Sequence, residues 1–165
     1  MVFLILRVRT LSLGRQNKKR RGEMIVSEFL NRHKDDGLLV LRLGIGLMFI
    51  FHGYGKLTGG VEAWRGVGSA MSFVGVRFGY SFWGFMAMVA ELGGGLCLIL
   101  GLFFRPACFM MFFTMLIATI MHLAKQHGLQ GASHAIEAGI VFLSLFILGP
   151  GPHTLINKLK TLLKK

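Results

Sequence analysis

The sequence predicts an all-α integral membrane protein, a four-helix bundle with both termini in the cytoplasm. Of its 165 residues, 53% are hydrophobic and only 16% are charged, whereas a soluble domain carries about 25% charged residues. Four apolar segments are each long enough to cross, or nearly cross, a hydrocarbon core of about 30 Å. Because backbone polar groups cannot stay unpaired in lipid, all four segments should be helices.

The third and fourth predicted spans carry signals for where a helix begins or ends. The third begins at Pro106, which suits a first helical turn because its missing N–H has no partner there. The fourth has Ser133 as a plausible N-cap and the run Gly-Pro-Gly-Pro at 149–152 as a stop. The predicted spans are residues 38–57, 82–104, 106–125 and 133–149.

The orientation follows from the basic residues. Nine of the 19 Lys and Arg residues precede Leu38 and four lie in the last eight positions. With the N-terminus inside, 14 of them, Arg105 included, fall on the cytoplasmic side and four fall outside. This distribution follows the positive-inside rule, so both termini should be cytoplasmic. The net charge of +12 therefore indicates the surface of a lipid bilayer as the partner, and not a nucleic acid.

Three segments flank or join the spans. Residues 1–37 form a basic cytoplasmic extension without a small-residue cleavage site, so a signal peptide is not predicted. Either Met1 or Met24 could be the start of the chain. The loop 58–81 contains an amphipathic piece, 61–73, expected to be a short helix at the outer interface. Residues 150–165 form a basic cytoplasmic tail.

Ionisable residues inside the spans carry the functional prediction. Glu91 lies near the middle of span 82–104, where a charged side chain costs about 2.5–3.5 kcal/mol. It should therefore have a partner, a proton or a task, and it is the candidate for proton handling. The predicted depths place ionisable groups of all four spans in the outer half of the bundle. The predicted ligand-binding pocket there consists of His52, Lys56, Glu91, His122 and Glu137.

Other residues have structural interpretations. Arg42, near the inner end of its span, should extend its charged head to the interface, and Gly93, Gly94 and Gly95 should let a neighbouring helix approach closely. Glu91 itself could serve only as an interhelical contact. Cys97 and Cys108 are expected to be free thiols. Because the histidines and carboxylates are spread over four helices, no metal site is predicted.

These motifs together resemble the DoxX family of small four-helix bacterial inner-membrane proteins. The resemblance rests on Arg-Leu-Gly-Ile-Gly (42–46), His-Gly-Tyr-Gly-Lys-Leu (52–57), Glu-Leu-Gly-Gly-Gly (91–95), Arg-Pro-Ala (105–107), His122, Glu137 and Gly-Pro-Gly-Pro (149–152), and covers about residues 37–157. It implies an inner-membrane protein associated with a quinone- or thiosulfate-type redox system, with a quinone as cofactor and a redox or sulfur-transfer protein as partner.

Three functions remain open from the sequence. In a redox-linked subunit the pocket would hold a quinone head group or a small sulfur species, with His52 and His122 as hydrogen-bond partners and Lys56 attracting an anion. In a non-enzymatic scaffold the polar residues would only lock the helices together. In a small proton or solute permease, a homo-oligomer could form the path. The residues do not settle whether the chain catalyses a reaction.

Overall fold

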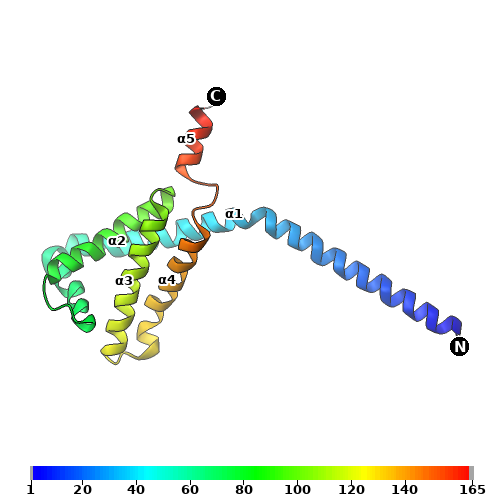
Figure 1. Ribbon diagram of the computed structural model, residues 1–165, viewed down its shortest axis with the longest axis horizontal. Helices are drawn as coiled ribbons and strands as arrows, with labels where there is room; N and C mark the ends of the chain where they lie inside the picture. Colours follow the sequence, from blue (N-terminus) through cyan, green and yellow to red (C-terminus); the bar gives the residue numbers. More distant parts are fainter. Residues whose placement is uncertain (1, 164–165) are drawn as a thin grey trace. The chain divides into compact units, whose positions relative to one another are not determined.

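The computed structural model describes the backbone of residues 2–163 and the side chains of residues 27–163, and this part of the chain contains helices and no strand. Residues 1–37 and 38–165 fall in two compact units. The elements, coloured along the chain in Figure 1, are α1 (Val2–Gly68), the 3-10 helix η1 (Ser69–Val74), α2 (Tyr80–Leu100), α3 (Phe104–Ala124), α4 (Gly128–Leu148) and α5 (Leu155–Leu163).

Within the described residues, four helical stretches are long and apolar enough to cross a membrane, which confirms the predicted all-α membrane class. They are Ser27–Thr58 within α1, Tyr80–Leu100, Phe104–Ala124 and Gly128–Leu148. α3 packs against both α2 and α4 (Figure 1). In lipid there is no hydrophobic driving force between helices, so they associate through close packing. Small residues permit the closest approach.

Within α2, α3 and α4, two boundaries differ from the prediction by four residues or more. α2 ends at Leu100 because Gly101, with φ of 70°, adopts the left-handed conformation of a helix C-cap and donates its N–H to the Cys97 carbonyl at 2.8 Å. α4 starts at Gly128, earlier than expected. Ser133 therefore lies inside α4, where its hydroxyl donates to the Gln130 carbonyl at 2.9 Å instead of capping the helix.

The segment after the first span folds back onto the bundle. Gly60, with φ of 61° and ψ of −153°, interrupts the helical geometry of α1, as only glycine does readily. Beyond it, the Trp64 indole Nε1 donates to the Lys56 carbonyl at 2.9 Å. A Cβ on Gly84 would collide with the Trp64 carbonyl, so the end of α1 lies directly against the start of α2.

Glycines also bring the first span against α2. A Cβ on Gly95 would stand 2.6 Å from the Gly46 carbonyl, and one on Gly94 would stand 2.7 Å from the Met111 sulfur. A Cβ on Gly93 would meet no atom within 4 Å, so the close packing does not extend to Gly93. Cys97 and Cys108 are free thiols. The buried apolar core joins α1, α2, α3 and α4 through Phe49, Leu98, Phe104, Ala107, Cys108, Met111, Met115, Ala135, Ala138, Phe142 and Leu145.

Candidate functional site

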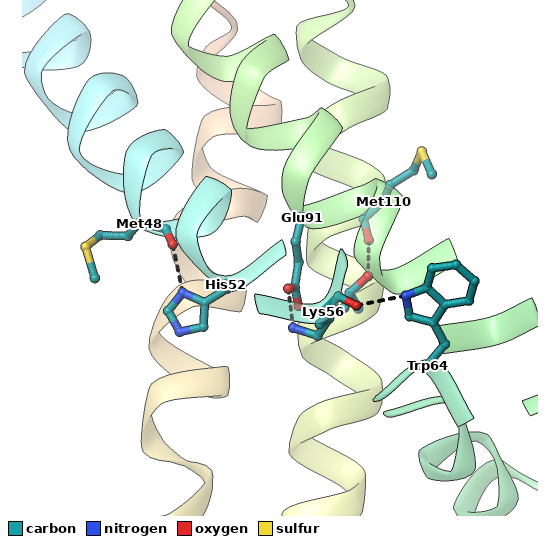
Figure 2. A network of polar contacts seen from close by, with 7 residues as sticks. Met48, His52, Lys56, Trp64, Glu91 and Met110 are labelled. Carbon is teal, nitrogen blue, oxygen red and sulfur yellow. Dashed lines mark hydrogen bonds and ion pairs between the residues drawn. The ribbon is translucent and has the colours of Figure 1, made fainter. Parts of the chain in front are cut away.

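An ion pair between two helices forms the centre of the site. The Lys56 ammonium of α1 contacts the Glu91 carboxylate Oε2 of α2 (Figure 2). The Glu91 side chain is 4% exposed and the Lys56 side chain 19% exposed. The bond from Trp64 to the Lys56 carbonyl fixes the backbone that carries the ammonium group (Figure 2). Each charge therefore has an opposite partner in surroundings where an unpaired charge would be costly.

A cavity of about 450 Å³ borders this pair. It lies between α2, α3, η1 and the C-terminal part of α1, and within residues 27–163 Lys56 and Glu91 are its only charged lining residues. The rest of the wall is almost wholly apolar, aromatic or thioether-bearing; it includes Val67, Met71, Phe82, Trp83, Met86, Ala87, Ala90, Met110, Phe113, Thr114, Ile117, Ala118 and Met121. We call this cavity the chamber. It has the size and polarity of a small-molecule site, since such sites are mostly apolar with a few polar groups.

Trp83, a lining residue of the chamber, has an unused hydrogen-bond donor. Its indole Nε1 is buried and has no hydrogen-bond partner among residues 27–163, although Trp83 itself lines the chamber. An unpaired buried donor costs about 1–3 kcal/mol. By contrast, the Thr114 hydroxyl, on the α3 side of the same chamber, already donates to the Met110 carbonyl at 2.9 Å. Trp83 is thus the lining residue whose polar group still lacks a partner.

His52, one of the predicted pocket residues, faces α4 and not the ion pair. His52 lies one turn before Lys56, but its Nδ1 donates to the Met48 carbonyl at 2.8 Å (Figure 2). Its ring stacks on His134 of α4, with centroids 5.5 Å apart and planes 20° apart. Phe49 stacks on the same two rings. His52 is therefore part of an aromatic contact between α1 and α4 and does not line the chamber.

The remaining two predicted residues also lie elsewhere. His122, near the end of α3, contacts His127 through their Nδ1 atoms at 3.0 Å. Glu137 is exposed on α4. Because α4 begins at Gly128, Glu137 is near the middle of its helix and not in the first turns. Of the five residues predicted to form one pocket, Lys56 and Glu91 line the chamber, whereas His52, His122 and Glu137 do not.

Arg42 contradicts the expectation that it extends to the interface. Its side chain is fully buried. The guanidinium donates to the carbonyls of Leu98 (3.0 Å) and Ile99 (3.3 Å) at the end of α2. It also donates to the carbonyls of Pro150 and His153 after α4. A cation suits the end of α2, where unpaired carbonyls carry partial negative charge. Arg42 therefore links three parts of the chain and is closed to ligands.

Trp83 is the functional candidate that sequence reasoning missed. Trp83, Ala87 and Glu91 recur every four residues, so they share one face of α2. That spacing could have placed the indole on the Glu91 side, whereas the α3 half of the chamber carries no polar signal beyond Thr114.

Among the described residues, no group of three His, Cys, Asp or Glu side chains could hold a metal ion.

The fold and its motifs define a multi-pass inner-membrane protein of the DoxX family, whose family model matches residues 37–124. The chain belongs to this family. Its sequence is 33% identical over 140 residues to the "Inner membrane protein YqjF" of Escherichia coli (strain K12), an alignment that covers 78% of this chain and 98% of the relative. No solved structure matches the chain.

Proposed function

We propose that the chamber binds the head group of a quinone-type ligand and that the protein acts as a membrane partner of a redox system. The observation that carries this proposal is the unpartnered Trp83 Nε1–H in the wall of an apolar chamber that also borders the Lys56–Glu91 pair. Family membership supports the membrane location, and the quinone is inferred from the chemistry of the chamber together with the resemblance stated above.

The residues present fit such a ligand. A quinone head group is a flat apolar ring with carbonyl acceptors. Its ring would pack against the apolar wall, and one of its carbonyls would accept a hydrogen bond from the Trp83 Nε1–H. The Lys56 ammonium is a second donor on the chamber wall. When bound, a quinone supplies two-electron, two-proton chemistry.

Glu91 has the proton role in this proposal. Its carboxylate borders the chamber and is almost completely buried, so a proton at Oε2 or Oε1 would be held within reach of a bound ligand and away from bulk water. The Lys56 ammonium contacts this carboxylate from α1. His52 and His122 have no ligand contact in this version, because they lie outside the chamber wall.

Ligand binding by the full-length protein in nanodiscs tests the proposal. A short-chain ubiquinone analogue should bind in isothermal titration calorimetry, and Trp83→Phe should weaken binding about 3–10-fold, the value of one hydrogen bond. Glu91→Gln should also weaken it. Glu137→Gln is the matched control, because it alters a carboxylate outside the chamber, and it should bind like the parent. The proposal is wrong if the analogue does not bind, or if Trp83→Phe and Glu91→Gln both match the parent.

A scaffold function has an observation of its own in its favour. The buried charges of Lys56, Glu91 and Arg42 are all satisfied within the chain, so a ligand is not needed to balance them. In this alternative Glu91→Gln lowers stability without any change in ligand response. Affinity purification from membranes should then recover a stoichiometric protein partner.

A further inference from the structure

The C-terminal helix α5 has two chemically distinct faces. Its apolar residues recur at i, i+1, i+4, i+7 and i+8, which places them on one side of a helix; they are Leu155, Ile156, Leu159, Leu162 and Leu163. Lys158 and Lys160 flank this apolar face, one on each side, and Asn157 and Thr161 lie opposite it. The apolar face is not packed in the fold, since Leu159 is 49% exposed and Leu163 is 86% exposed.

The start of α5 is fixed to the end of the bundle. Thr154 is buried, and its Oγ1 accepts the backbone N–H of Asn157 at 3.2 Å, the geometry of a helix N-cap. A Cβ on Gly101 would stand 2.7 Å from the Thr154 methyl group. Arg42, already bonded to the end of α2, donates to the His153 carbonyl at 3.1 Å.

This attachment sets the level at which α5 begins. α2 ends at Leu100, α3 begins at Phe104 and α4 ends at Leu148, so the contacts of Arg42 and Thr154 hold the first residue of α5 beside three span ends. A nine-residue helix is too short to cross a membrane. Because span ends lie at the boundary between the hydrocarbon core and the head groups, we expect the exposed apolar face to start at that boundary.

We propose that α5 is an interfacial helix that lies along the inner surface of the bilayer. Its leucines and isoleucine insert at the acyl boundary, and Lys158 and Lys160 contact anionic phospholipid head groups. Amphipathic helices of this kind bury their apolar face about 5–10 Å into the interface, and nearby Lys residues add attraction to an anionic surface. The partner is an anionic lipid surface. The inference does not depend on the chamber or its ligand.

Site-specific labelling of the full-length protein tests the helix position. Cys97→Ala removes the more accessible thiol, whereas the buried Cys108 should stay unlabelled; the Cys97→Ala protein alone measures that blank. Leu159→Cys reports the apolar face and Thr161→Cys is the matched reporter on the polar face. Each carries an environment-sensitive fluorophore in vesicles of phosphatidylcholine with phosphatidylglycerol.

The expected result is that nitroxide-labelled lipid quenches the label at position 159 roughly twice as strongly as the label at 161, and that aqueous iodide shows the reverse order. Equal quenching at both positions overturns the proposal. So does a label at 159 that is shielded from both quenchers, because a protein surface would then cover the face.

A second arm tests the head-group contact. Replacing Lys158 and Lys160 with Gln should reduce lipid quenching at position 159 in vesicles with phosphatidylglycerol and leave it unchanged in pure phosphatidylcholine. A loss of similar size in both vesicles would contradict recognition of anionic lipid.

Discussion

The Lys56–Glu91 pair makes a quantitative prediction about interhelical stability. Replacing Lys56 with Met leaves a carboxylate that is 4% exposed without its cation. Removing one partner of a buried pair costs about 3–5 kcal/mol, so Lys56→Met should lower the free energy of unfolding by that amount. Glu91→Met should cost less, about 2–3 kcal/mol, because the remaining ammonium is 19% exposed and can reach water more easily.

The double substitution should recover most of this loss. With both charges replaced by Met, no uncompensated charge remains beside the apolar chamber, and stability should return to within about 1 kcal/mol of the parent. The three variants then define a double-mutant cycle whose coupling free energy, the sum of the two single losses minus the double loss, is about 4–8 kcal/mol. A neutral interhelical hydrogen bond in a membrane is worth only about 0.6 kcal/mol, so the size of the coupling distinguishes an ion pair from such a bond.

Reversible unfolding in mixed micelles of lipid and sodium dodecyl sulfate measures these values. Glu137→Gln is the control, since it changes an exposed carboxylate on α4, and should shift stability by less than about 0.5 kcal/mol. Additive effects of the two Met substitutions, with a coupling below about 0.6 kcal/mol, would refute the claim that the pair holds α1 against α2.

Two further predictions concern packing. Arg42→Met should destabilise the protein on the order of 3 kcal/mol, because carbonyls at the end of α2 and after α4 lose their donor. Arg105→Gln is the control, because Arg105 is exposed, and it should have little effect in the same unfolding assay. Equal losses for the two variants would contradict the assigned role of Arg42. Gly95→Ala should cost about 1–3 kcal/mol, because its methyl group meets the Gly46 carbonyl. Gly93→Ala should be neutral or slightly stabilising, and thermal stability that falls equally for both would show that helix contact is not the cause.

The spans were predictable because lipid simplifies the problem. Length and apolar character alone require a helix when no water can satisfy the backbone, and the four observed spans overlap the four predicted ones. The start of α4 was misplaced because Ser133 has the chemistry of an N-cap. A serine inside a helix can instead bond its own preceding turn, as it does here with Gln130.

The composition of the pocket was harder to predict because depth does not specify direction. His52 and Lys56 are one turn apart on α1, so their spacing alone places them on one face of the helix. In the structure the first span packs between two neighbours, so His52 meets His134 of α4 while the longer Lys56 side chain reaches Glu91 of α2. The rotation of each helix depends on which glycines allow contact, Gly46 with Gly95 in this case. Sequence spacing along one helix contains no information about that pairing.

Arg42 and Glu91 show how a buried charge can be assigned to structure or to function. Both are almost inaccessible in the structure, at 0% and 3% exposure. The Arg42 guanidinium is enclosed by four carbonyls and the Phe104 ring, with its centre 5.2 Å from the ring centroid, and it borders no part of the chamber. Glu91 has one partner, Lys56, and both line a cavity large enough for a ligand. Because a charge can act on a ligand only where it borders space that the ligand can occupy, depth in the membrane is a weaker guide to function than the surroundings of the charged atoms.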